Sequence, residues 1–469
     1  MSTDALLHGH YGAASPPPAY GTTNHQHHQH YHHHHHVPHA PVVIHPQYPR
    51  TVVVVTGRSR PRCRFCKAFV FAILIWVLIG SVVRHLILLG HRHYPKPHQW
   101  AVGPANQSVD YPIPADIDLE ACDEPLVDGP GPSLTSFEID SPSETLLLLS
   151  AGSWLAGSVK VTTSSSNSVK FSVSTHLVRR RWGDNTADTI VCRLKRKDGE
   201  LGVGIFNPIH PRPRYNQVVY EVVLELPEGH PFINRFETNV LNTRQELGDL
   251  QDKIFFQDLN LHGSNGAIKA TSVSADRAQI RTSNGAIEGH YNASDDFVIA
   301  TSNARVDVTV DFNIIKKSQA KMTINTSNGP LKADIGLHDG RFSDSFSESF
   351  PDFLVSTHTS NSRLDVTFQD SPVNSILTYR GSTSNSPANV YLHWTFEGRF
   401  HLNSHSPWFN PIVNEHQVDD PTDKGRTRSV RYSNVRGYVD GEVKWGNEIN
   451  RKKGEVDVST SNSRITLDL

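Results

Sequence analysis

Two Arg-x-Asp pairs have the residue types and spacing that chemistry would need. Arg305 precedes Asp307, and Arg363 precedes Asp365, at equivalent positions of a repeated unit. Clustered acidic and basic side chains in a groove suit a polysaccharide-active enzyme, whereas solvated ion pairs simply keep a sheet surface soluble. The second interpretation is favoured, because Arg464 of a later unit lacks the acid. The chain contains no GxSxG, HExxH or P-loop motif, so we expect no enzyme, no catalytic residue and no cofactor.

A run of histidines near the N-terminus is the first candidate set of metal ligands. It consists of His32, His33, His34, His35 and His36, within a low-complexity segment rich in His and Pro. Neutral imidazoles can bind divalent metal ions. No carboxylate or cysteine lies among them at ligand spacing, so we expect a solvated tail rather than a defined metal site.

The four cysteines fall into two pairs. Cys63 and Cys66 form a CxxC among arginines, a spacing compatible with zinc or redox chemistry. No second CxxC or HxxxH follows, so S-acylation beside a membrane, or a pair of inert thiols, is the better interpretation. Cys122 and Cys192 lie further along the chain and could form one disulfide, but the sequence leaves their pairing open.

A recurring tripeptide, usually Thr-Ser-Asn, marks the elements that would position such residues. Its asparagines are Asn265, Asn284, Asn303, Asn328, Asn361, Asn385, Asn434 and Asn462. Apolar or small residues recur at positions −4, +3 and +5 relative to the asparagine, which is the pattern of strands with one buried face. The alternation shifts by one across the asparagine, so the chain must bend there. Glycine follows three of the asparagines, which favours a corner with left-handed backbone.

Two architectures satisfy this pattern. In a β-solenoid each repeat is one coil, the shortest being 19 residues, and the asparagines stack along one edge. In an antiparallel β-hairpin array or sandwich, each Asn-Gly would occupy a hairpin turn. The all-β solenoid is favoured, because identical Thr-Ser-Asn side chains in stacked coils can hydrogen-bond to one another, whereas hairpin turns do not require the same Thr-Ser before every asparagine. We expect the solenoid over residues 261–469, an N-terminal β region or cap over 146–260, and a short helical insertion over 236–255.

An apolar segment divides the chain into two compartments. Residues 68–83 contain no charged residue, and the stretch 65–90 is long enough for a transmembrane helix. Basic residues precede it and an acidic, Pro-rich linker over 91–145 follows, so the positive-inside rule places residues 1–64, a disordered His/Pro-rich tail, in the cytosol. We therefore expect a single-pass type II membrane protein with a signal-anchor, at the cell surface or in a secretory-pathway lumen. The candidate N-glycosylation sites Asn106, Asn292 and Asn325 all fall on the outer side.

The charge distribution excludes nucleic acid as the main partner. The chain has 45 Lys and Arg against 47 Asp and Glu, a formal net charge of −2. Its first part is basic and its outer part is acidic, whereas phosphate binding needs a basic face. Trp394, Trp408 and Trp445, with His401 and Tyr438 nearby, instead offer aromatic faces that could contact a sugar.

The repeat sequence resembles a known family. Units of the form TSNG-x-I-x-(A/G), which follow the strand QVVYEVVLELPEG, are similar to the putative-adhesin β-solenoid domains found in bacteria and in fungal single-pass membrane proteins. The resemblance covers roughly 145–469 and implies a β-solenoid with an adhesion-type role. That family has no catalytic residues to transfer to this chain.

The sequence therefore predicts a membrane-anchored, non-catalytic interaction module. A glycan or a protein is the expected ligand of the outer domain, with affinity from repeated weak contacts along the solenoid. A polysaccharide-active enzyme on a solenoid scaffold and a passive structural spacer are the two alternatives.

Overall fold

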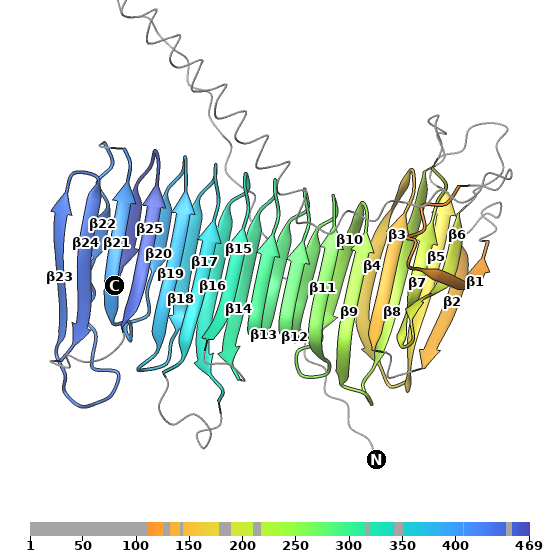
Figure 1. Cartoon of the computed structure of the whole chain (residues 1–469), viewed down its shortest axis with the longest axis horizontal. Helices are drawn as coiled ribbons and strands as arrows, with labels where there is room; N and C mark the ends of the chain where they lie inside the picture. The colour runs from red at the N-terminus through yellow and green to blue at the C-terminus, as the bar shows by residue number, and fades with distance from the viewer. Residues whose placement is uncertain are drawn as a thin grey trace, which may run out of the picture. The chain divides into compact units, whose positions relative to one another are not determined.

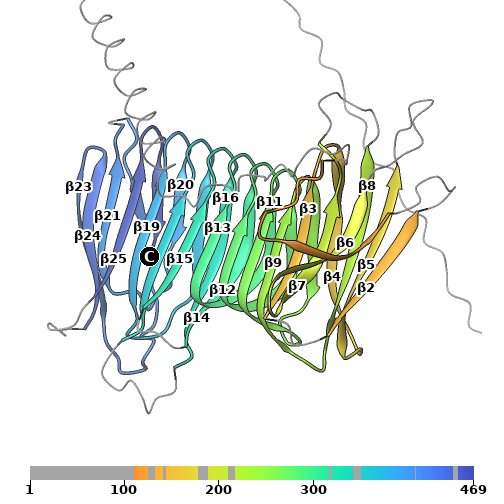
Figure 2. The same ribbon diagram turned by 45° about the vertical axis from the view of Figure 1, so that its right-hand side comes forward.

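A computed structural model describes residues 110–124, 132–140, 144–177, 189–209, 217–315, 319–341, 350–406, 408–446 and 453–469. These residues form 26 strands and no helix, which confirms the all-β prediction. The strands stack into a long β-solenoid with two sheets around a main core, and a second, smaller hydrophobic cluster near one end includes Leu147, Cys192 and Phe206 (Figure 1, Figure 2). Each coil contributes one strand to each sheet.

Sheet I holds the strands that precede the asparagine corners. In spatial order it consists of β1 (Asp118–Asp123), β6 (Ile190–Lys197), β7 (Glu200–Phe206), β3 (Thr145–Ala151), β9 (Phe232–Val240), β11 (Phe255–Gly263), the second halves of β12 (Ile268–Arg281) and β13 (Ile287–Ala300), β15 (Gln319–Asn325), β17 (Asp352–His358), β19 (Ile376–Thr383), β25 (Gly454–Thr460), β21 (Gly398–Ser404), β24 (Tyr438–Trp445) and β23 (Arg428–Val435). The long strands β12 and β13 continue into both sheets.

Sheet II holds the strands that follow the corners. In spatial order it consists of β2 (Ser133–Asp140), β5 (Ser168–Leu177), β8 (Val218–Pro227), β4 (Leu155–Ser164), β10 (Thr243–Asp249), the first halves of β12 and β13, β14 (Val306–Ile314), β16 (Leu331–Asp339), β18 (Leu364–Asp370), β20 (Ala388–Tyr391), β26 (Ile465–Asp468) and β22 (Ile412–Asn414). Pairing is parallel throughout the coils and antiparallel only at the two ends.

Residues at the same repeat position lie side by side in successive coils. Ile268 pairs with Ile287, which pairs with Val306, and the column continues through Leu331 and Leu364. Each of these residues follows its asparagine by three positions. A hairpin would instead pair residues on opposite sides of the same asparagine, so the hairpin array is excluded for the repeats and the solenoid is confirmed.

The core is built from the inward-facing half of each strand. In β14, Val306, Val308, Val310 and Phe312 are at most 2% exposed. Their alternation with exposed or half-exposed residues is the period of two that a half-buried strand requires. Burial of one such side chain contributes about 1.5–3 kcal/mol, and the repetition of this pattern in every coil stabilises the stack.

The order of strands departs from the order of the sequence at both ends. The β7/β8 coil lies outside the β3/β4 coil, although it follows it in the chain. The β25/β26 coil is inserted between the β19/β20 and β21/β22 coils. Antiparallel strands then extend each end, with β5 and β6 at one and β24 and β23 at the other.

The solenoid begins earlier than the sequence indicated. The predicted linker over 91–145 contains β1 and β2, which extend the two sheets. The predicted cap over 146–260 contributes complete coils, so the boundary at residue 261 does not exist in the fold. The helical insertion expected over 236–255 is wrong, because this stretch forms most of β9 and all of β10.

The N-terminal predictions lie outside the described residues. These are the tail over 1–64, the apolar segment over 65–90 and the first part of the linker. In the part of the chain that the structure describes, no helix has the length and apolarity that crossing a membrane requires.

Candidate functional site

The asparagine corners form one continuous column along the solenoid. From Asn265 onward each Nδ2 donates to the Oδ1 of the asparagine in the adjacent coil, at 2.6 Å from Asn284 to Asn265 and at 2.9 Å from Asn462 to Asn385. The column contains Asn242, Asn265, Asn284, Asn303, Asn328, Asn361, Asn385 and Asn462. Asn434 is not a corner, so that prediction was wrong: it lies in β23 and pairs with a residue of the antiparallel β24. Asn242 was not among the predicted corners, because Val-Leu precedes it in place of Thr-Ser.

Threonine hydroxyls secure the corners on the buried side of this column. Thr301 Oγ1 donates to the Gly285 carbonyl at 3.1 Å, and Thr326 Oγ1 donates to the Ala304 carbonyl at 3.0 Å. Thr326 is 2% exposed, and its oxygen also accepts a hydrogen bond from the Gly329 backbone at 3.3 Å. The Thr-Ser-Asn signature therefore joins coils and serves the fold rather than chemistry.

The backbone at these corners differs from the expectation. Among the asparagines of the column only Asn242 has a positive φ, of 52°, so the left-handed corner predicted at the Asn-Gly repeats is wrong. Glycine is needed there for another reason: a Cβ at Gly285 would lie 1.8 Å from the Gly266 carbonyl oxygen of the adjacent coil. Close packing of coils, rather than φ, selects glycine at this position.

The Arg-x-Asp pairs lie on the outward surface of sheet II, called face II from here on. Arg363 donates to Asp365 at 2.7 Å, whereas Arg305 donates to Glu288 of the adjacent coil at 3.0 Å rather than to Asp307. Exposed ion pairs of this kind contribute about 0–1 kcal/mol each. Each of these arginines is already paired with a carboxylate on the same face, which fits the interpretation as solvated ion pairs.

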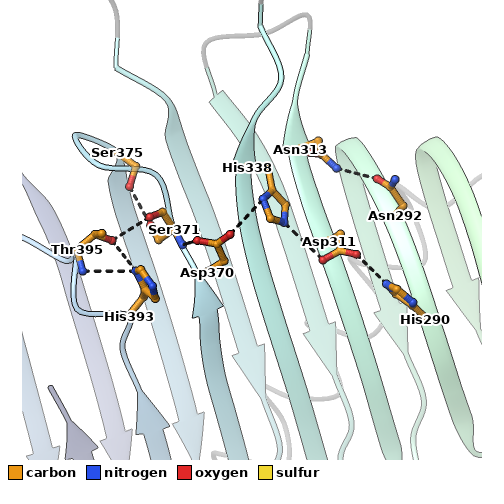
Figure 3. A network of polar contacts seen from close by, with 10 residues as sticks. All are labelled: His290, Asn292, Asp311, Asn313, His338, Asp370, Ser371, Ser375, His393 and Thr395. Carbon is orange, nitrogen blue, oxygen red and sulfur yellow. Dashed lines mark hydrogen bonds and ion pairs between the residues drawn. The ribbon is translucent and has the colours of Figure 1, made fainter. Parts of the chain in front are cut away.

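A string of alternating imidazoles and carboxylates crosses four coils of face II (Figure 3). His290 Nε2 lies 2.8 Å from Asp311, His338 Nε2 lies 3.5 Å from Asp311, and His338 Nδ1 lies 3.7 Å from Asp370. Gly336 makes room for this arrangement, because a Cβ there would lie 2.8 Å from His338 Nε2. Since each carboxylate already faces an imidazole, the string ties coils together.

The outward surface of sheet I, called face I from here on, carries several polar side chains that have no partner in the described part of the chain. Within the described residues, the side chains of Asn260, Gln279, Arg281, Arg380 and Arg399 make no hydrogen bond or ion pair. They point outward because they alternate with buried residues along their strands. Other polar groups of face I are paired, such as Arg277 with Asp258 at 2.6 Å, so face I combines ion pairs with these five free side chains.

Two grooves lie on face I. The amide groove, of ≈280 Å³, is lined by Glu237, Thr238, Asn239, Asn260, Leu261, His262, Gln279 and Arg281. The end groove, of ≈570 Å³, is lined by Arg399, His401, Arg431, Tyr432, Ser433, Asp440, Gly441 and Glu442. From β11 to β24, the middle strands of the two grooves, the pairings make eight inter-strand steps of about 4.8 Å, so the groove centres lie about 38 Å apart along the continuous sheet.

His401 is the central side chain of the end groove. Its Nδ1 lies 2.8 Å from Asp440, and Asp457 is its neighbour on the opposite side, in β25. Donor atoms of His401, Glu455 and Asp457 lie within 4.8 Å of one another, a mixed imidazole and carboxylate set that could hold a divalent cation. Burial raises the pKa of the Asp457 carboxyl and the Glu455 carboxylate raises it further, whereas His401 and Arg380 act in the opposite direction.

The other predicted site residues fall in several places. Cys122 and Cys192 are joined by a disulfide that connects β1 to β6. Asn292 and Asn325 are half-exposed strand residues, and Asn292 accepts a hydrogen bond from Asn313 at 2.7 Å. The candidates that lie outside the described residues are His32, His33, His34, His35, His36, Cys63, Cys66 and Asn106.

The aromatic candidates for sugar contact separate by exposure. Trp408 is 81% exposed and Trp394 is 48% exposed, but Trp445 is only 3% exposed. Tyr438 lies beside the end groove, with its hydroxyl 3.4 Å from His401 Nδ1. His401 and Tyr438 were predicted from the sequence, but the acidic residues around them were not. Alternation of Glu455 and Asp457 with buried valines was the available signal, and nothing in it indicated which strands would be neighbours.

Comparisons with known proteins add little to this geometry. No protein-family model matches the chain, and no curated protein matches it either. A solved structure from Clostridium sporogenes, described as a "putative cell adhesion protein", aligns over 72% of this chain and 99% of its own, with 10% identity and a TM-score of 0.16. A likeness of that size does not establish a shared fold or family.

Proposed function

We propose that the solenoid is a non-catalytic, adhesin-like interaction module that binds an extended polysaccharide along face I. Unpaired polar side chains in the two grooves of face I carry this proposal. Asn260, Gln279 and Arg281 in the amide groove, and Arg399 in the end groove, make no hydrogen bond or ion pair among the described residues. Such groups lose little on meeting sugar hydroxyls, because no internal hydrogen bond must first be broken. The spacing of about 38 Å between the groove centres, eight inter-strand steps of about 4.8 Å, suits a polymer, since weak contacts at both grooves would add.

The location is part of the same proposal. Residues 65–90 would anchor the chain as a single-pass type II protein, with the solenoid at the cell surface or in a secretory-pathway lumen. The apolar segment and the basic residues before it support this topology. The disulfide between Cys122 and Cys192 agrees with it, because disulfides persist in oxidising compartments.

A polysaccharide-active enzyme is the second candidate, and Asp457 is the observation in its favour. A carboxyl group with a raised pKa beside a second carboxylate could act as a general acid. However, Glu455 and Asp457 are two residues apart in one strand and rise from the same flat face. Glycoside hydrolysis requires the two carboxyl groups to flank a bound sugar, and neither Glu455 nor Asp457 lines the end groove, so binding is favoured over cleavage.

Retention of the full chain on insoluble polysaccharides tests the proposal. Replacing Asn260 and Gln279 by Ala should lower the affinity roughly tenfold, from the loss of two hydrogen bonds of about 0.5–1.5 kcal/mol each. Thr309→Ala on face II is the matched control and should leave retention unchanged. An absence of retention on every polymer, or an equal loss in the control, would contradict the proposal. Release of soluble sugar that Asp457→Asn abolishes would favour the enzyme instead.

A further inference from the structure

Sheet I ends in two exposed strands of opposite charge. β1, at one end, carries Asp118, Glu120 and Asp123 but no basic residue, and all of its residues are exposed. β23, at the other end, carries Arg428 and Arg431 but no acidic residue, and its last five residues are exposed. Among the described residues each strand pairs on one side only, β1 with β6 and β23 with β24. The backbone groups on the other side are those that a further strand could use.

Both terminal strands run in the same direction as the strands of the coils. β1 is antiparallel to β6, which is antiparallel to β7, so β1 and β7 point the same way. The same holds for β23 and β21, through β24. A second copy displaced along the solenoid would therefore place its β1 beside β23 as a parallel neighbour, which is the pairing used between coils. We propose that copies of this chain associate head to tail through these two strands.

Charge favours this pairing over the alternatives. Two β1 strands would bring carboxylates together, and two β23 strands would bring guanidiniums together, whereas β1 against β23 joins opposite charges. Leu119 is 36% exposed and Val435 is 63% exposed, so each edge also offers apolar surface. A register shift between Leu119 and Ala121 interrupts β1, which limits the length of regular pairing. The association should therefore be reversible and sensitive to salt.

Charged edge strands also protect sheets from aggregation, and the experiment separates this role from association. The full chain, in detergent solution, is examined by sedimentation velocity over a range of protein concentrations. At about 0.01 M salt the Debye length is about 30 Å, and at about 1 M it is about 3 Å. We expect the sedimentation coefficient to rise with protein concentration at low salt and this rise to disappear at high salt. A monomer at every concentration and both salt levels would overturn the proposal.

Charge reversal identifies the strands. A variant with Arg428→Glu and Arg431→Glu makes both ends acidic, and a variant with Asp118→Lys and Asp123→Lys makes β1 basic, so neither variant should self-associate. An equimolar mixture of the two should associate again, because each then meets an opposite charge. Circular dichroism establishes that each variant is folded. If one variant is not folded, the self-association of the other is compared with that of the wild-type protein.

A control separates this proposal from the proposed function, because Arg431 also lines the end groove. Arg399→Glu changes the same groove from the internal strand β21, and it should lower polysaccharide retention but leave association intact. Association that survives both reversals, or that the mixture fails to restore, would refute head-to-tail pairing. Neither result depends on a polysaccharide being bound.

Discussion

Thr326→Val should destabilise the solenoid more than Asn303→Ala, although asparagine is the residue that marks each corner in the sequence. Asn303 donates to Asn284 at 2.6 Å and accepts from Asn328 at 2.7 Å. All three side chains are exposed, so water replaces the lost hydrogen bonds. A hydrogen bond contributes about 0.5–1.5 kcal/mol net, and for two exposed bonds the low end gives a loss of about 1 kcal/mol.

Replacing Thr326 lowers the free energy of unfolding more, because its side chain is buried. Its hydroxyl donates to the Ala304 carbonyl at 3.0 Å and accepts from the Gly329 N–H at 3.3 Å. Valine keeps the shape of the side chain but leaves the buried Gly329 N–H without this acceptor. An unsatisfied buried group costs about 1–3 kcal/mol in addition to the lost bond, so we expect the free energy of unfolding to fall by about 2–4 kcal/mol.

Urea unfolding of the full chain measures both losses, and hydrogen exchange of the corner peptides localises them. Local values are needed because stacked coils can open one after another. Thr309→Val on face II is the matched control: it makes the same chemical change at an outward position and should stay within about 0.5 kcal/mol of wild type. A loss for Asn303→Ala as large as that for Thr326→Val would refute the argument that burial sets the cost.

Three further changes test other parts of the fold. Gly285→Ala should lower the free energy of unfolding by about 1–3 kcal/mol or more, because the new methyl would meet the Gly266 carbonyl oxygen at 1.8 Å; an unchanged melting temperature would contradict this close packing. Cys122→Ser should cost up to about 4 kcal/mol, the chain-entropy estimate for a sequence separation of 70, and limited proteolysis should then cut near β1 first. The hydrogen bond from Arg196 lowers the pKa of the Glu200 carboxyl below its ordinary value of 4.5. The ionised carboxylate therefore stabilises the fold fully above pH 4.5, and this stabilisation is lost as the pH falls through the lower pKa of the folded state. Glu200→Gln should make the free energy of unfolding depend less on pH in this acid range.

The coils could be predicted from sequence because each one must solve the same packing problem. A column such as Ile268, Ile287 and Val306 is buried on one side and stacked on the next coil. Alignment on the asparagines therefore gave the register as well as the strands. The stretch 236–255 was misread because its Glu, Gln and Leu favour helix locally, and pairing with neighbouring coils overrides that weak preference.

Other errors arose from topology, which no local pattern contains. Asn434 matches the repeat by its Tyr-Ser-Asn triplet, but the chain there forms a hairpin at the end of sheet I. The true step in the column runs from Asn385 to Asn462, a separation of 77 residues. This step is long because the chain first builds the β21/β22 coil and the β23–β24 hairpin, and then returns to insert β25 and β26.

That return places the carboxylates of Glu455 and Asp457 beside His401 of the end groove. A regular solenoid places like residues against like residues, as the asparagine column does, and so repeats one chemistry along each row. Different groups can converge only where neighbouring coils differ in sequence. Insertion of β25 between β19 and β21 puts Asp457 beside Arg380 on one side and His401 on the other. No linear motif marks such a site, because its members come from distant strands. In repeat proteins of this kind, the coils that break the order of the sequence are therefore where a search for binding sites should begin.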